Sequence, residues 1–162
     1  MKTSMNYYSV NMLMGVLLLL SCNSKTQNEH QDYFYTDIGG GTKRIPLIKP
    51  YEVKKITENE WRLELQTTQL LELSIHNVKS VNIIDSVIVV HAMGDVSIKG
   101  ITCSEGWFVI LPSRKVEKGF ASETEFFTYL NEAGVKFSKF YYVDDIFNTF
   151  NKNKKINWRS LQ

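Results

Sequence analysis

The stretch VNIIDSVIVVHA, residues 81–92, predicts a β-hairpin and decides the fold class. Residues 81–84 and 87–92 are rich in β-branched side chains, which favour strands. Asp85-Ser86 between them is typical of a tight turn. Val87-Ile88-Val89-Val90 has no polar position, so we expect this strand to lie at the centre of a sheet and to be covered on both faces.

Further strand patterns lie on both sides of this hairpin. Trp61-Arg62-Leu63-Glu64-Leu65 and Leu71-Glu72-Leu73-Ser74-Ile75 alternate apolar and polar side chains, which predicts strands with one buried and one solvated face. Pro46 indicates an edge strand and Pro112 the end of a strand, because proline has no amide hydrogen for a sheet ladder. Besides the hairpin, the expected strands are residues 44–49, 61–65, 71–75, 96–101 and 107–111.

After Gly119 the apolar residues change from the period of a strand to that of a helix. Ser122-Glu123-Thr124-Glu125 has the pattern of a capping box at a helix start. Gly134 is placed to end this helix in the left-handed conformation. A second helix is expected over residues 145–150, with Asp144 as its N-cap. The apolar face of the first helix consists of Phe126, Phe127, Leu130 and Ala133.

This order of elements indicates the α+β class, with an antiparallel β-meander sheet followed by two C-terminal helices packed on it. The composition, with 43% hydrophobic and 22% charged residues, is typical of a globular protein. Residues 33–162 have the length of a single domain. The net charge of +2 argues against a nucleic-acid partner, because nucleic-acid-binding proteins carry a clear basic excess.

Residues 1–21 have the features of an export signal. Lys2 supplies a positive start, and the apolar run of residues 12–20 (MLMGVLLLL) is far shorter than the roughly 20 residues that span a bilayer. The run ends in Leu19-Leu20-Ser21-Cys22, which resembles the lipobox of bacterial lipoproteins: an aliphatic residue, a small residue, then the cysteine. The resemblance covers only the leader and the cysteine.

The resemblance implies that Cys22 carries diacylglycerol on its thiol and becomes the first residue of the mature protein. Asn23 is not the aspartate that this family uses for inner-membrane retention, which favours the outer membrane of a Gram-negative cell envelope. Residues 22–32 are polar after the cysteine and predict a flexible tether. The alternative is an ordinary secretory signal and a disulfide between Cys22 and Cys103, but Leu19 does not suit its cleavage site.

Cys103 is the first candidate for chemistry, as a nucleophile with His91 as its base. We expect it in a loop beside Glu105, and no family signature surrounds it, so a small, partly buried apolar role is the simpler interpretation. His30, His76 and His91 lack the spacing of a metal site. No metal or cofactor is therefore expected.

The remaining motifs have structural interpretations. Gly39-Gly40-Gly41 opens no helix and is interpreted as a turn rather than a phosphate loop. Asp144-Asp145 and Glu123/Glu125 are close carboxylate pairs, but they lie at expected helix starts, where the helix dipole favours negative charge. The basic residues near the C-terminus are interpreted as a solvated tail, with contact to anionic lipid as the alternative. They are Lys152, Lys154, Lys155 and Arg159.

Aromatic residues give the one positive indication of function. Tyr33-Phe34-Tyr35 and Phe140-Tyr141-Tyr142 bracket the expected domain, and consecutive side chains on a strand point to opposite faces, so some of them should be exposed. Exposed tyrosines favour a binding surface for a protein or a glycan. The sequence therefore predicts a non-enzymatic, membrane-anchored envelope lipoprotein that binds such a partner. The alternative is a small envelope hydrolase that uses Cys103 and His91.

Overall fold

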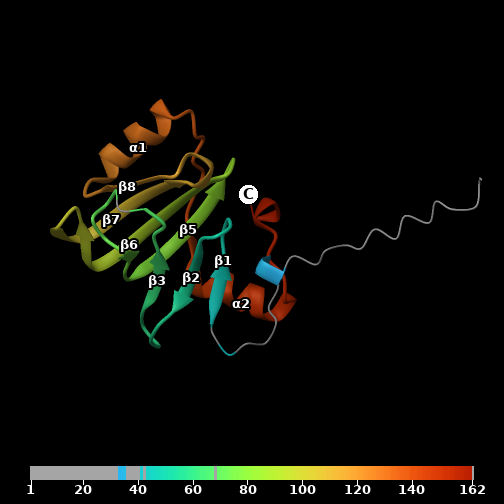
Figure 1. Cartoon of the computed structure of the whole chain (residues 1–162). Helices are drawn as coiled ribbons and strands as arrows, with labels where there is room; N and C mark the ends of the chain where they lie inside the picture. Colours follow the sequence, from blue (N-terminus) through green and yellow to red (C-terminus); the bar gives the residue numbers. More distant parts are fainter. Residues whose placement is uncertain (1–32, 36–40, 42, 68, 162) are drawn as a thin grey trace, which may run out of the picture. The chain divides into compact units, whose positions relative to one another are not determined.

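The hairpin of residues 81–92 lies at the centre of a five-stranded antiparallel sheet (Figure 1). The computed structural model describes residues 33–35, 41, 43–67 and 69–161. Strands β5 (Val78–Ile84) and β6 (Val87–Ile98) are joined by Asp85 and Ser86, whose φ angles of 47° and 68° are those of the turns that close two-residue hairpins. Both the hairpin and the central, buried position of residues 87–90 are confirmed.

The sheet has the strand order β8-β7-β6-β5-β9. A turn at Lys99-Gly100 connects β6 to β7 (Ile101–Leu111), so the stretch expected as one strand over residues 96–101 forms the two ends of a hairpin instead. The other strands are β8 (Val116–Phe120) and the two-residue edge strand β9 (Tyr141–Tyr142).

A second antiparallel sheet has the order β1-β2-β3-β4. Pro46 ends β1, at the edge of this sheet, as its missing amide hydrogen predicts. The chain leaves β4 for the other sheet at Asn77, which has a φ of 51°, a conformation that asparagine tolerates better than most residues. The meander therefore runs through two sheets. The strands are β1 (Arg44–Pro46), β2 (Glu52–Lys55), β3 (Trp61–Glu64) and β4 (Ser74–Ile75).

Helices α1 (Glu123–Glu132) and α2 (Val143–Asn153) complete the α+β fold, with β9 between them. Ser122 occupies the N-cap position of α1, but its side chain makes no capping hydrogen bond. Gly134 has the expected left-handed conformation, with a φ of 73°. Asp144 is not the N-cap of α2, because the helix begins one residue before it. Short 3₁₀ helices are η1 (Tyr33–Tyr35), η2 (Pro112–Arg114) and η3 (Trp158–Ser160).

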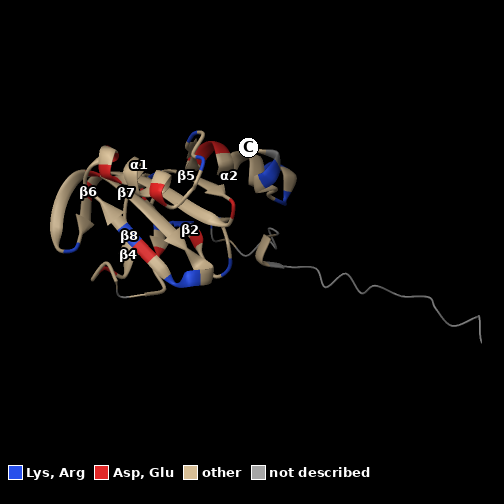
Figure 2. Ribbon diagram, turned by 90° about the horizontal axis from the view of Figure 1, so that it is seen from above, with Lys and Arg blue, Asp and Glu red and all other residues tan. Residues whose placement is uncertain are grey.

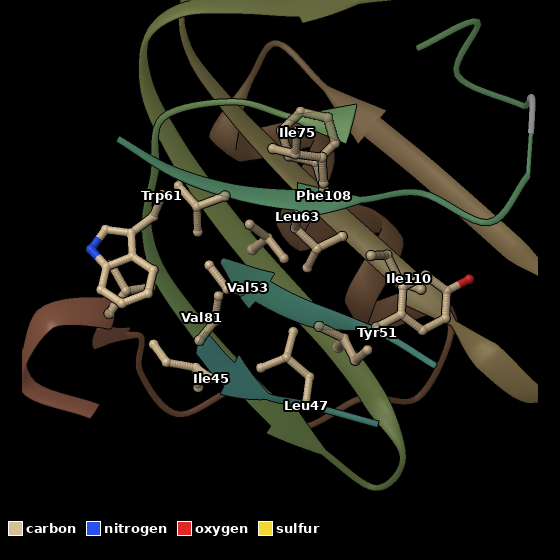
Figure 3. Close-up of a cluster of buried hydrophobic side chains, with 14 of the residues drawn as sticks. Ile45, Leu47, Tyr51, Val53, Trp61, Leu63, Ile75, Val81, Phe108 and Ile110 are labelled. Atoms are coloured by element: carbon tan, nitrogen blue, oxygen red, sulfur yellow. The ribbon is translucent and has the colours of Figure 1, made fainter. Parts of the chain in front are cut away.

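The five-stranded sheet is covered on both faces, and each face has its own core. The first core lies between the two sheets and continues onto α2 (Figure 3). The second lies between the sheet and α1, where Phe126 and Leu130 pack near Val89 and Val109. Residues 32–162 form one compact unit that contains both cores, so we expect this unit to fold without residues 1–31.

The prediction of a strand over residues 71–75 is wrong in its first half. Only Ser74 and Ile75 pair with β3, and Leu71 and Leu73 are 76% and 80% exposed. Leu71 has a φ of 63°, which takes it out of the strand conformation. The Glu72 carboxylate turns inward and accepts hydrogen bonds from Ser97 Oγ, at 2.6 Å, and from the Gly100 amide, at 3.3 Å. The polar residue is thus held and the leucines face solvent.

A buried carboxylate joins the two sheets. Glu117 of β8 is almost completely buried, and its oxygens accept hydrogen bonds from the Tyr51 hydroxyl at 2.9 Å and from the amides of Gln66 and Thr67 at 2.7 and 3.0 Å. The Thr67 hydroxyl is a fourth donor. Burial, followed by the hydrogen bond to Glu117, raises the pKa of the Tyr51 hydroxyl far above its ordinary value. Four donors therefore stabilise this buried charge.

We predict that Glu117→Gln lowers the free energy of unfolding by about 3 kcal/mol. An amide has one acceptor oxygen, and its NH₂ group would face backbone N–H donors that then lack an acceptor. Urea unfolding measures the change, with Glu132→Gln on the exposed side of α1 as the control. Equal stabilities of the two variants would contradict the role given to Glu117.

Candidate functional site

A cleft of about 450 Å³ lies where the edge strand β9 meets α2 and the C-terminal segment. Its β9 wall is formed by Tyr141 and Tyr142, and its C-terminal wall includes Lys155. The volume is in the range of sites that hold a small ligand or a short segment of a partner. We therefore take this cleft as the main candidate site.

One face of α2 lines the cleft with polar side chains. Asp145, Thr149 and Asn153 follow one another at intervals of four residues, so they lie above one another on the same side of the helix. The Thr149 hydroxyl donates to the Asp145 carbonyl at 3.0 Å, so it offers a ligand only its lone pairs, in one row with the carboxylate of Asp145 and the amide of Asn153. The site can therefore hydrogen-bond a polar ligand along the length of the helix.

Two tryptophan side chains attach the walls of the cleft to the four-stranded sheet. Trp158 Nε1 donates to the Pro46 carbonyl at 3.0 Å, which fixes the C-terminal segment. Trp61 Nε1 donates to Asp144 Oδ1 at 2.9 Å, which fixes the start of α2. The carboxylate of Asp144 is thus used by this bond and not for capping. Sites with walls attached to a sheet keep their shape and lose less entropy on binding.

The tyrosines of β9 differ in their surroundings. Tyr142 is 69% exposed, in line with the expectation that some of the consecutive aromatic residues face solvent. The Tyr141 hydroxyl is buried and has no hydrogen-bond partner among the described residues. Lys139 Nζ lies 4.9 Å from the centre of the Tyr141 ring, and Asn82 Nδ2 donates to the Lys139 carbonyl at 2.8 Å, which holds this segment beside β5. The cleft thus combines an exposed aromatic ring with a buried hydroxyl.

Cys103 and His91 do not form a nucleophile and base pair. Cys103 lies within β7 and not in a loop, because the β6–β7 hairpin continues to Ile98 and Ile101. His91 pairs with Trp107, four residues along β7 from Cys103. At the rise of a strand this separation is roughly 13 Å, far beyond hydrogen-bond reach.

His91 is enclosed by aromatic rings instead. Its ring stacks on Trp107 at a centroid distance of 5.2 Å and lies 5.8 Å from that of Phe140. Nε2 is buried and 3.8 Å from the nearest Glu105 oxygen, too far for a hydrogen bond. Burial lowers the pKa of His91, while the charges of Glu105 and Glu123 oppose this effect. His91 is therefore a packing residue held in its neutral form.

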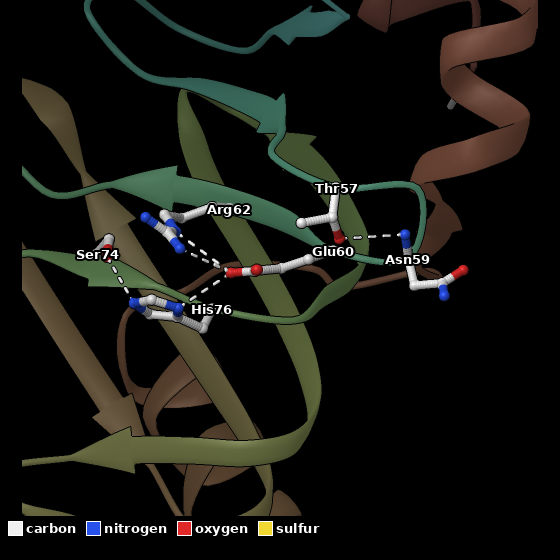
Figure 4. Close-up of polar contacts among 6 residues, drawn as sticks. All are labelled: Thr57, Asn59, Glu60, Arg62, Ser74 and His76. Carbon is white, nitrogen blue, oxygen red and sulfur yellow. Dashed lines mark hydrogen bonds and ion pairs between the residues drawn. The ribbon is translucent and has the colours of Figure 1, made fainter.

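His76 belongs to a polar network on the exposed face of the four-stranded sheet (Figure 4). Ser74 Oγ lies 3.0 Å from His76 Nε2, and His76 Nδ1 lies 3.1 Å from Glu60 Oε1. The same oxygen accepts two hydrogen bonds from Arg62, which are the main cause that lowers the pKa of Glu60. The order of serine, histidine and carboxylate is that of acyl-transfer enzymes, but the His76 side chain is 47% exposed and solvated. We interpret the network as a set of polar contacts on the solvated surface of the four-stranded sheet, without a catalytic role.

The other candidates from the sequence do not gather at one place. Cys22, His30 and Gly39-Gly40 lie outside the described residues. Glu123 and Glu125 lie in the first turn of α1, as expected from the helix dipole. The ribbon near the C-terminus carries blue stretches, which mark Lys and Arg (Figure 2), and Lys152, Lys154, Lys155 and Arg159 are all exposed. Groups of His, Cys, Asp and Glu that could hold a metal ion are absent from the described residues.

The polar row on α2 was missed from the sequence. Residues 145–150 were expected as a short helix, whereas α2 runs to Asn153 and so brings a third polar residue onto the row. The spacing of Asp145, Thr149 and Asn153 is the signal that could have found it. No local pattern in the sequence indicated that these α2 side chains line the same cleft as the tyrosines of β9.

We predict that the free energy of unfolding decreases as the pH falls below about 6.5, partly because of His91. The folded protein has the lower pKa, so the unfolded chain takes up the proton first, and stability is lost between 6.5 and the pKa of the folded state. Urea unfolding at pH 7.5 and pH 5 measures this difference. His91→Phe should reduce the difference, and an unchanged difference in this variant would contradict the prediction.

The described residues contain no helix that is long and apolar enough to cross a membrane. The chain matches no family model, and no curated protein or solved structure matches it either. What this protein binds must therefore be inferred from its own residues.

Proposed function

We propose that this protein is a non-enzymatic lipoprotein of the bacterial cell envelope that binds a protein partner in the cleft between β9 and α2. The observation that carries the binding role is the cleft itself, in which the exposed ring of Tyr142 stands beside the polar row of α2. Tyrosine beside adaptable polar groups is the composition of many protein-binding surfaces. The lipid anchor is supported by the lipobox at residues 19–22.

The shape of the site supports an extended partner segment. β9 is the outer strand of the five-stranded sheet, and an outer strand offers backbone groups to which a further strand can pair. The side chains of Asp145, Thr149 and Asn153 then meet the segment from the side of α2.

We predict that Cys22→Ser abolishes both the lipid modification and the cut before residue 22, because serine cannot carry the thioether-linked lipid and Leu19 does not suit an ordinary cleavage site. Cys103→Ser is the matched control and should keep a lipid-modified first peptide. Mass spectrometry of the N-terminal peptide of each variant measures both outcomes. A first peptide of the parent protein that begins at Cys22 and carries no lipid would contradict the lipid anchor.

We predict that a photo-crosslinking phenylalanine derivative at position 142 joins the protein to one partner protein in intact cells. The same group at position 56, an exposed aliphatic residue on the turn after β2, is the control and should give no such product. For the purified pair, Tyr142→Ala should weaken binding by about 2 kcal/mol, a factor of about 30.

The crosslinking experiment also separates the alternatives. Identical products at positions 142 and 56 would argue against binding in the cleft. If glycan-degrading enzymes remove the crosslinked product, the partner is a glycan and not a protein.

A further inference from the structure

The polar groups that line the cleft change in kind from one end of α2 to the other. In the first turn of the helix Asp145 offers a carboxylate, and one turn later Thr149 offers the lone pairs of its hydroxyl. At the end of the helix Asn153 adds an amide with two N–H donors, and Lys155 follows with an ammonium group. The cleft therefore has hydrogen-bond acceptors at one end of α2, and donors with positive charge at the other.

Positive charge predominates around the cleft. Lys139 and Lys155 line it together with a single carboxylate, that of Asp145. The neighbouring Asp144 is engaged by the four-stranded sheet, where its Oδ1 lies 3.8 Å from Lys55 Nζ. Residues 136–162 contain no acidic side chain besides these two, and their basic side chains are Lys136, Lys139, Lys152, Lys154, Lys155 and Arg159. The surroundings of the cleft therefore carry a net positive charge.

The two lysines that line the cleft differ from the cations of the four-stranded sheet. Lys54 in β2, for example, forms an ion pair with Glu52 at 3.2 Å. Lys139 and Lys155 are exposed, and neither forms an ion pair with a carboxylate among the described residues. The contact of Lys139 with the Tyr141 ring keeps its ammonium group beside β9. Both positive charges are thus available to an anionic ligand in the cleft.

We propose that the partner segment in this cleft is extended and acidic, with carboxylates that pair with Lys139 and Lys155. The backbone N–H groups of an extended segment suit the acceptors of Asp145 and Thr149 at the start of α2. Carboxylates suit the ammonium groups, because charge complementarity steers a partner to its site and excludes wrong partners. The proposal rests on the proposed protein-binding role of the cleft and names the chemistry of the partner.

An anionic membrane surface is the other ligand that attracts basic residues. Two features of the cleft favour a peptide segment. The lysines line a concave site of about 450 Å³, which the flat surface of a bilayer does not enter. The Asp145 carboxylate in the same lining repels phosphate headgroups, whereas a peptide offers it N–H donors. A peptide segment therefore satisfies both ends of the cleft at once.

The test selects binding sequences from a phage-displayed library of random octapeptides on purified residues 32–162, which form one compact unit with both cores. Peptides that bind the parent protein but not Tyr142→Ala occupy the cleft, and Asp and Glu should be enriched in them. A synthetic peptide of this group should bind Lys139→Glu/Lys155→Glu about tenfold more weakly, and salt should weaken its binding to the parent.

The matched control is Lys99→Glu/Lys115→Glu, which changes the net charge by the same amount at two exposed turns that do not line the cleft. This variant should bind the synthetic peptide like the parent. Equal weakening in both double variants would overturn the proposal, because the effect would then come from the net charge of the protein and not from the cleft.

The other outcomes separate the acidic partner from the proposed function. Peptides that depend on Tyr142 but lack acidic residues would overturn the acidic partner and leave the cleft as a protein-binding site. If no selected peptide depends on Tyr142, the proposed function fails and the acidic partner with it. Phosphatidylglycerol vesicles that bind the parent but not Lys139→Glu/Lys155→Glu, without acidic enrichment in the peptides, would assign the lysines to a membrane surface instead.

Discussion

A buried carboxylate held by hydrogen-bond donors determines how the two sheets are joined. The Glu117 carboxylate is stabilised by four hydrogen-bond donors, two of which are backbone amides in the loop that follows β3. A buried carboxylate is costly unless its lone pairs are satisfied, so the loop has to bring its amides to this position. The path of the loop before and after these amides is set by that requirement.

Local patterns were sufficient for the elements that a single stretch of sequence specifies. Three such features have the conformation that their residue types favour: the β-branched run at residues 87–90, the turn at Asp85-Ser86 and the glycine after α1. The stretch of residues 71–75 failed because alternation does not say which face has a partner. Its polar residue found one in the hairpin turn at Gly100, and this contact between segments far apart in sequence has no local signal.

The candidate site was only partly visible in the sequence for the same reason. The aromatic residues at positions 140–142 were recognised as a binding indication, and one of them, Tyr142, is exposed in the cleft. The polar row on α2 acquires its meaning only when β9 adds to the edge of the sheet beside it. Cys103 and His91 were expected to act together, but the register of β6 and β7 places them four residue pairs apart. Residue types indicated chemistry, but pairing register decided which residues meet.

The tryptophan contacts that attach the cleft to the four-stranded sheet also bear on the order in which the chain can fold. Trp158 reaches back 112 residues to Pro46, and Asp144 reaches back 83 residues to Trp61. Contacts of such sequence separation form slowly, because a long loop must close before they stabilise anything. The four-stranded sheet therefore gains its last contacts only when the end of the chain is present. A chain still under synthesis therefore lacks the contact that fixes the end of β1 until residue 158 has been added.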